Sequence, residues 1–332
     1  MASGLENPPR SRLTAARAAK LKSFLEPLFI RYHHAGFLET DPLRYVHRYR
    51  LPEDRETVAL LSAALAYGNV RTIFGSIERV LEILGPSPAA FLRDFDRNEV
   101  RRRLAPFRHR FNSGDDVLLL LHWTGLSLAR WGRLGEHFRQ FYKTGDSDIG
   151  PALSGWVRSM LASDCTPVYA DGLLPGPASA RFLLSDPADG SACKRMNLFL
   201  RWMVRRDELD VGLWDFIQPS QLVLPLDAHL SRIVRYLGLT DRATNGWAAA
   251  QEATASLRLL DPDDPLRYDF ALCRLGILGD CPAKPDRVTC ASCMLLPVCR
   301  AGTSRTRLRK GRSGQKREAS TTAYAARPSE PI

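Results

Sequence analysis

Four cysteines constrain what this chain can fold into more than any other feature. They lie in the stretch CPAKPDRVTCASCMLLPVC, with the spacing C-x8-C-x2-C-x5-C, at Cys281, Cys290, Cys293 and Cys299. Thiolates placed this closely along a chain are typical of a metal centre. Structural zinc sites usually join two paired knuckles across a longer gap. One close pair flanked by single cysteines, without histidine, favours a 4Fe–4S cluster, and zinc is the alternative.

The remaining cysteines and the absence of apolar runs indicate the compartment. Seven cysteines is an odd count, and the three outside the cluster are scattered along the chain, at Cys165, Cys193 and Cys273. A secreted disulfide framework would be even in number and spread through a shorter chain. The sequence begins without an apolar signal segment and has no run of about 18 apolar residues that would span a bilayer. We therefore expect a cytoplasmic protein with no membrane association.

The net charge is concentrated in the last part of the chain. The formal charge is +11, and residues 300–332 hold nine Lys/Arg and two Glu. A basic balance suits a polyanionic partner, although a solubilising tail would explain it as well. Residues 1–19 and the basic tail 303–332 have few large apolar side chains and are expected to be disordered.

The periodicity of apolar residues predicts an all-α fold. They recur at intervals of three and four, and no series of alternating strands is visible. The expected helices cover residues 21–34, 52–69, 70–85, 114–132 and 194–206. The segment 52–69 is apolar nearly all round, which places it in the centre of a helical core. Residues from about 167 to 190, rich in Pro, Gly and Ser, indicate a long loop.

The stretch PLDAHLSRIVRYLGL, residues 225–239, predicts a further helix. Its apolar side chains form one stripe, made of Leu230, Ile233, Val234 and Leu237, and Gly238 supplies the end. Asp227 comes just before the helix, where a carboxylate accepts hydrogen bonds from the first free N–H groups. Capping is the ordinary role of an aspartate at this position. Arg232 lies off the apolar stripe, where it is free to contact phosphate.

Together these stretches resemble the helix-hairpin-helix DNA glycosylases of the endonuclease III superfamily. That family has a proline–valine–aspartate–threonine–histidine stretch entering a helix, and its iron–sulfur members close with C-x6-C-x2-C-x5-C. This chain has PLDAH and the last three cysteines at matching spacing, with a first gap two residues longer. ETVALLSAALAYGN is similar to the family's early core helix. The resemblance covers roughly residues 20–302.

The sequence looks closer still to the bacterial DUF2400 family, a family of unknown function within that superfamily. Its stretches similar to CKRMNLFLRWMVR and PSQLVLPLDAH match this chain nearly throughout. The resemblance implies two lobes with the site in the cleft between them. Residues 55–222 would form a helical barrel lobe, and 20–54 plus 223–302 would form the iron–sulfur lobe.

The resemblance implies a DNA base-excision glycosylase, with or without AP-lyase activity, that acts as a monomer on a damaged base flipped out of double-stranded DNA. Asp227 would stabilise the oxocarbenium ion or activate water. Lys194 would attack the sugar and form a Schiff base, for which its amine must be neutral. An ordinary lysine at a helix start is the alternative. The family's leucine–proline–glycine–x–glycine hairpin is absent, and Lys194 follows Gly190 by four residues in LLSDPADGSACKRMN.

Further candidates follow from residue type and neighbourhood. DNA contacts are expected from Gly190, Arg195, Arg232, Lys284 and Arg287. A flipped base needs an aromatic platform and polar edges, for which the candidates are Tyr67, Trp202, Trp214 and Gln218. Aromatic residues at helical spacing are more often part of the core. Two other functions fit the same sequence: a non-catalytic nucleic-acid-binding iron–sulfur module, and a zinc-stabilised helical scaffold that binds protein partners.

Overall fold

The structure, a computed structural model, describes residues 13–302 and is mostly helical, which confirms the all-α prediction. The termini 1–12 and 303–332, which were expected to be disordered, lie outside the described residues. The first α-helices are α1 (Ala15–Tyr32), α2 (Pro52–Ala64), α3 (Val70–Leu84), α4 (Pro88–Arg93), α5 (Arg97–Leu104), α6 (Gly114–Trp131) and α7 (Leu134–Arg139). The others are α8 (Gly150–Leu161), α9 (Lys194–Val204), α10 (Ala228–Leu237), α11 (Trp247–Arg258), α12 (Asp269–Ile277) and α13 (Arg287–Ser292).

Short 3-10 helices and one small hairpin complete the described chain. The 3-10 helices are η1 (Ala35–Thr40), η2 (Pro42–Arg48), η3 (Ser179–Phe182), η4 (Pro187–Asp189), η5 (Pro219–Gln221) and η6 (Leu296–Val298). The hairpin pairs β1 (Arg108–His109) with β2 (Asn112–Ser113) in antiparallel register. Strands of two residues are too short to give an alternating pattern, so the sequence did not predict them. The predicted long loop is confirmed, since only η3 and η4 interrupt residues 167–190.

Helix α1 begins earlier than the sequence indicated. Residues 15–19 were assigned to a disordered segment, and this is wrong because they form the first turns of α1. The Thr14 side chain caps the helix by accepting the Arg17 N–H at 3.2 Å. The Arg17 guanidinium also donates to the carbonyl oxygens of Leu237 and Val298, which ties this end of α1 to the C-terminal part of the fold.

The other predicted helices are confirmed, with ends set by local chemistry. Helix α3 stops at Gly85, whose φ of 69° is a left-handed conformation that glycine adopts without strain. Helix α6 begins with a capping box between Ser113 and Asp116. Helix α2 is buried along most of its length, as its all-round apolar character predicts, but it ends at Ala64 rather than near Gly68.

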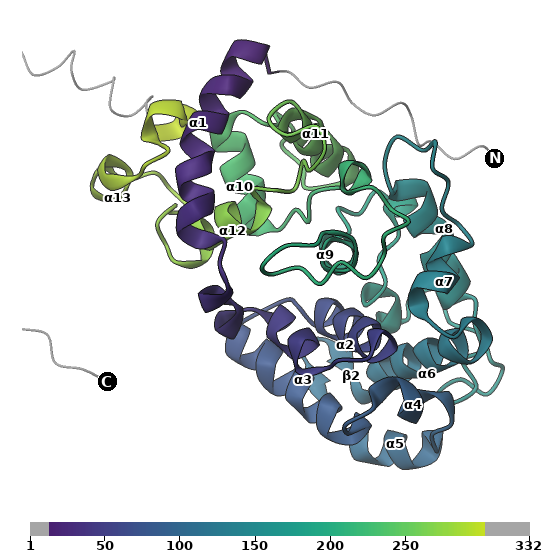
Figure 1. Ribbon diagram of the computed structural model, residues 1–332. Helices are drawn as coiled ribbons and strands as arrows, with labels where there is room; N and C mark the ends of the chain where they lie inside the picture. The colour runs from purple at the N-terminus through teal and green to yellow at the C-terminus, as the bar shows by residue number, and fades with distance from the viewer. Residues whose placement is uncertain (1–12, 303–332) are drawn as a thin grey trace, which may run out of the picture.

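The helices are arranged around α9, which lies near the middle of the molecule (Figure 1). Helix α1 packs on α12 and η6, and α10 packs on α12, so the start and the end of the described chain lie together. Helix α2 packs on η2, α4 and α9, and α6 packs on α4, α5, α7 and α8. Residues of α2, α9 and α12 therefore approach one another where these groups of helices meet.

A buried network of ion pairs joins α9 to the segment that leads into α12. Arg201 lies 3.2 Å from Asp210 and 2.6 Å from Asp269, and all three side chains are almost completely buried. Arg205 reaches Asp210 at 2.5 Å and Asp264 at 2.9 Å. Each carboxylate that lies between these helices is thus paired, which charged groups require when they are removed from water.

Candidate functional site

Asp227 caps α10, as the sequence predicts. Its Oδ1 accepts the Leu230 N–H at 2.7 Å, and Gly238 ends the helix with a φ of 76°. The second carboxylate oxygen, Oδ2, lies 4.0 Å from Sγ of Cys273, which belongs to α12. One oxygen of Asp227 therefore holds the helix, while the other faces a neighbouring element.

Lys194 is the first residue of α9, and its Nζ donates to the Ala66 carbonyl at 2.8 Å, just beyond the end of α2. Burial and the Asp227 carboxylate raise the pKa of the Cys273 thiol well above its usual range, and the Lys194 ammonium acts in the opposite direction. Both candidate catalytic side chains thus act on one thiol. Cys273 was not a predicted site residue, because a single cysteine on an apolar helix carries no signal in the sequence.

Backbone strain lies beside Lys194. Among the described residues, only Arg110 and Cys193 are non-glycine residues with positive φ, at 54° and 47°. Cys193 comes immediately before Lys194, is buried, and has its thiol pKa raised by burial to about 12. Arg110 packs over Gly68, two residues after the carbonyl that Lys194 binds. Strained backbone persists where the surrounding structure fixes it, and it concentrates at functional sites.

Arg195 does not lie where a DNA-contacting arginine should, and this assignment is corrected. Its side chain is only 6% exposed. The guanidinium donates to the Ala64 carbonyl at 3.0 Å and to the Phe182 carbonyl, and burial lowers the pKa of Arg195 to about 10. Since Arg195 follows Lys194 by one position, it points to a different side of α9. It joins α9 to the end of α2 rather than contacting solvent.

The donor groups of two other predicted DNA contacts are used within the fold. The Gly190 N–H donates to the Pro187 carbonyl at 2.9 Å, and the Gly190 carbonyl accepts the Trp247 N–H at 3.0 Å. Arg232 donates through Nη2 to the Cys281 carbonyl at 2.6 Å and also hydrogen-bonds to the Cys281 thiol. As it lies, Arg232 holds the cysteine loop against α10.

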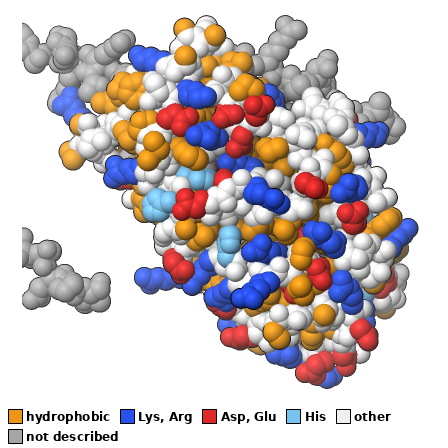
Figure 2. Space-filling model, viewed as in Figure 1, with side chains coloured by type: hydrophobic (Ala, Val, Ile, Leu, Met, Phe, Trp, Pro, Cys, Tyr) orange, Lys and Arg blue, Asp and Glu red, His pale blue; other side chains and the backbone are white. Residues whose placement is uncertain are grey.

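Lys284 and Arg287 are exposed, as phosphate-binding side chains need to be. Both lie between Cys281 and Cys290, and Arg287 begins α13. Figure 2 shows that Lys and Arg side chains on the visible face are interspersed with Asp and Glu rather than gathered in one patch. The basic excess of the chain is therefore not displayed as a single broad surface on that face.

The four base-pocket candidates lie in three different settings. Trp202 and Trp214 are in the hydrophobic core, at 0% and 1% exposed, and Trp214 Nε1 donates to Glu56 at 2.8 Å. Neither indole offers a free face to a base, so these two assignments are corrected. Gln218 is exposed and caps η5. Tyr67 is half-buried, its hydroxyl donates to the His109 carbonyl at 3.0 Å, and burial raises its pKa to about 12.

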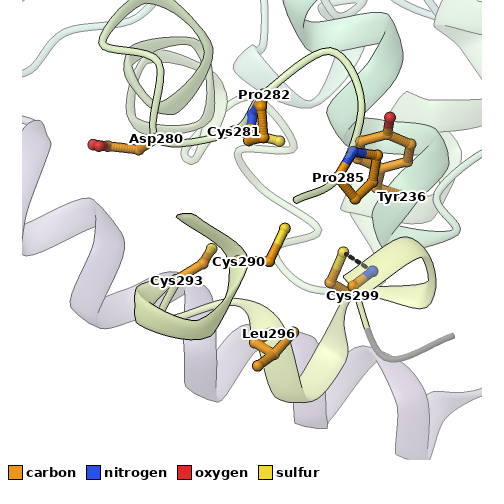
Figure 3. A pocket seen from close by; sticks show the side chains of 10 residues that line it. Tyr236, Asp280, Cys281, Pro282, Pro285, Cys290, Cys293, Leu296 and Cys299 are labelled. Atoms are coloured by element: carbon orange, nitrogen blue, oxygen red, sulfur yellow. Dashed lines mark hydrogen bonds between the residues drawn. The ribbon is translucent and has the colours of Figure 1, made fainter. Parts of the chain in front are cut away.

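The four clustered cysteines line one pocket together with Tyr236, Asp280, Pro282, Pro285, Leu296 and Gly302. Figure 3 shows the thiol side chains arranged around a common space. The Gly302 N–H donates to Sγ of Cys299 at 3.3 Å, and the Leu295 N–H donates to the Cys293 thiol. Hydrogen bonds of this kind stabilise thiolates that bind a metal centre. Within residues 13–302, no group of three or more His, Cys, Asp or Glu side chains is arranged to hold a single metal ion.

Burial is also the main influence on these thiols. It raises the pKa of both Cys281 and Cys293, and the neighbouring cysteines raise the pKa values further. The hydrogen bonds from Arg232 to Cys281 and from Leu295 to Cys293 act in the opposite direction. The pocket therefore brings together four soft donors that repel one another when ionised, unless a cation neutralises them.

The comparisons with known proteins agree with the family that the sequence resembles. The model of the family described as protein of unknown function (DUF2400) matches residues 41–278, and the chain belongs to this family. No curated protein and no solved structure matches the chain. In the part of the chain that the structure describes, no helix is both long and apolar enough to cross a membrane.

Proposed function

We propose that the protein is a DNA glycosylase that removes a damaged base after the nucleotide has left the duplex stack, with Asp227 and Lys194 at the reacting sugar. The observation that carries this proposal is the position of these two side chains. They are 33 positions apart in the sequence, come from different helices, and both act on the thiol of Cys273. A carboxylate beside an amine is the pair that glycosidic-bond cleavage at a sugar carbon requires.

Asp227 has one oxygen available for this chemistry. The hydrogen bond from the Leu230 N–H fixes Oδ1 and with it the orientation of the carboxylate. Oδ2 would face the sugar carbon, where positive charge develops as the bond to the base breaks. A charge held in a fixed position stabilises that transition state without first having to reorient.

Lys194 would act as the nucleophile in an enzyme that also cleaves the strand. In the structure its Nζ is held by the Ala66 carbonyl, so it must leave that oxygen and lose a proton before it attacks. Attack forms a bond from Nζ to the sugar C1′ while the base departs with the electrons of the glycosidic bond. The product is an aminal whose ring opens to a Schiff base, and borohydride reduces this Schiff base to a stable adduct.

Borohydride trapping tests the assignment of Lys194. With lesion-containing duplex DNA, we expect the wild-type protein to form a covalent adduct that Lys194→Gln no longer forms, because the amide has no nucleophilic amine. Lys20→Gln is the matched control, since Lys20 is an exposed lysine on α1. Base release without any trapped adduct would contradict the role of Lys194 and leave an enzyme that relies on Asp227 and water.

The cysteine pocket is proposed to hold a 4Fe–4S cluster, with a structural role. Four thiols around one space and N–H donors directed at their sulfur atoms support this assignment. The cluster would hold the loop that carries Lys284 and Arg287 in the position from which they reach a DNA phosphate. It would also hold residues 223–302 and α1 together as one lobe, which the packing of α1 on α12 and η6 supports.

Replacing one ligand tests the cluster. We expect Cys293→Ser to lose iron and the absorbance at about 400 nm that thiolate–iron centres show. Cys165→Ser is the control, because Cys165 is buried elsewhere and its thiol donates to the Ser163 carbonyl at 3.4 Å, as a hydroxyl can. A colourless wild-type protein that contains one zinc would contradict the cluster and favour the zinc-stabilised scaffold.

A further inference from the structure

An exposed pair of aromatic side chains lies close to Lys194. Phe111, between the two strands of the hairpin, is 55% exposed, and Phe182, at the end of η3, is 40% exposed. Their ring centroids are 4.4 Å apart at an interplanar angle of 71°. The Tyr67 ring contacts both, at 5.7 Å and 5.0 Å, and Tyr67 follows the residue whose carbonyl Lys194 binds. Clustered aromatic surface left in water indicates a partner.

The two phenylalanines are held in place by their backbones. Asn112 Nδ2 donates to the Ser179 carbonyl at 3.0 Å, which joins the hairpin to η3. Arg110, with a φ of 54°, forms the strained turn immediately before Phe111. Its side chain lies over Gly68, where a Cβ would come within 3.0 Å of the Arg110 Cδ. The pair is therefore a preformed surface on a fixed turn rather than two mobile side chains.

The charges around the pair favour an anionic, aromatic partner. The Arg195 guanidinium lies 3.7 Å from the Phe182 ring centroid and 5.0 Å from that of Tyr67. Arg110 and Arg195 both act on the Tyr67 hydroxyl, and the carboxylate that opposes them, Asp116, is only 3% exposed. An aromatic surface with cations behind and beside it suits the faces of nucleobases on a phosphate backbone better than an apolar peptide.

We propose that Phe111 and Phe182 stack against a nucleobase that has lost its neighbour in the duplex, beside the site of Lys194. This inference rests on the proposed function, because an enzyme that extrudes one nucleotide leaves adjacent bases unstacked. The aromatic faces would replace the stacking energy that these bases lose. Because the pair is next to the candidate nucleophile, it would also hold the open strand where the sugar reacts.

The test compares duplexes with and without an unstacked base. Binding of the full-length protein would be measured by fluorescence anisotropy with a fully paired duplex and with the same duplex carrying a single mismatch. We expect wild-type protein to prefer the mismatched duplex by about 5- to 100-fold, the range that base–aromatic stacking supplies. The double variant Phe111→Ala, Phe182→Ala should lose this preference while its affinity for paired DNA stays unchanged. Phe111→Trp with Phe182→Trp should retain it.

Two further arms make the result specific. Ile30→Ala with Leu173→Ala removes two other exposed apolar side chains, at 75% and 69% exposed, and should leave the preference intact. A preference that survives in the double alanine variant, or a wild-type protein without one, would overturn the inference. An aromatic-dependent preference without base release from any lesion would leave this inference standing and overturn only the proposed glycosylase activity.

Discussion

Replacing Asp227 by asparagine is expected to reduce base release by roughly 10²–10³-fold, the loss that follows removal of a fixed electrostatic group from a transition state. The fold should be retained. Asparagine caps helices about as well as aspartate does, so its side-chain oxygen can still accept the Leu230 N–H. The change therefore removes the negative charge at the sugar while keeping α10 in place. Single-turnover base release and the melting temperature would be measured on the same preparations.

A matched control separates charge from capping. Asp96 caps α5 by accepting the N–H groups of Asn98 and Glu99 at 2.8 Å and 3.1 Å, and it is exposed. Asp96→Asn makes the same chemical change at a helix start with no candidate site nearby, so base release should stay at the wild-type level. If Asp227→Asn released the base as fast as the wild-type protein, the carboxylate would have no catalytic role.

The largest effect on stability is expected from Arg201. Replacing it by methionine keeps the length of the side chain but leaves Asp210 and Asp269 buried with one cation fewer. Breaking a buried ion pair by removing one partner costs about 3–5 kcal/mol of unfolding free energy. The midpoint of denaturant-induced unfolding, measured anaerobically at equal protein concentration, would report this loss.

An exposed arginine provides the comparison. The Arg102 side chain is 70% exposed and pairs with Glu99, which is 51% exposed. Exposed ion pairs contribute up to about 1 kcal/mol, so Arg102→Met should shift the midpoint little. Equal losses for Arg201→Met and Arg102→Met would mean that the buried network does not join α9 to α12.

The helices were predictable because their signals are local. The apolar stripe of α10, Asp227 as its cap and Gly238 as its end all lie within a dozen residues, and all three are confirmed. The end of α2 was misplaced because its apolar run continues past Ala64 into the turn at Tyr67. The division into two lobes stays a proposal.

The site was harder to predict because it is built from contacts between distant segments. The sequence gives no reason to prefer Lys194 over Arg195 as the inward-facing residue, yet carbonyl groups at the end of α2 bind both side chains. Trp202 and Trp214 are the type of residue that a base pocket uses, but α9 and its neighbours bury them. Cys273 lies 46 positions after Asp227, and only the packing of α10 on α12 brings the two together.

The most direct test of the central claim is base release by the wild-type protein. Protein purified anaerobically, with its metal content measured, would be incubated with duplexes that each carry one lesion: 8-oxoguanine, uracil, thymine glycol, hypoxanthine or an abasic site. Mass spectrometry would detect the free base or the cleaved strand. The account predicts release from at least one of these lesions and none from undamaged DNA. Tight DNA binding with no release from any lesion would contradict the enzyme and favour a non-catalytic nucleic-acid-binding module.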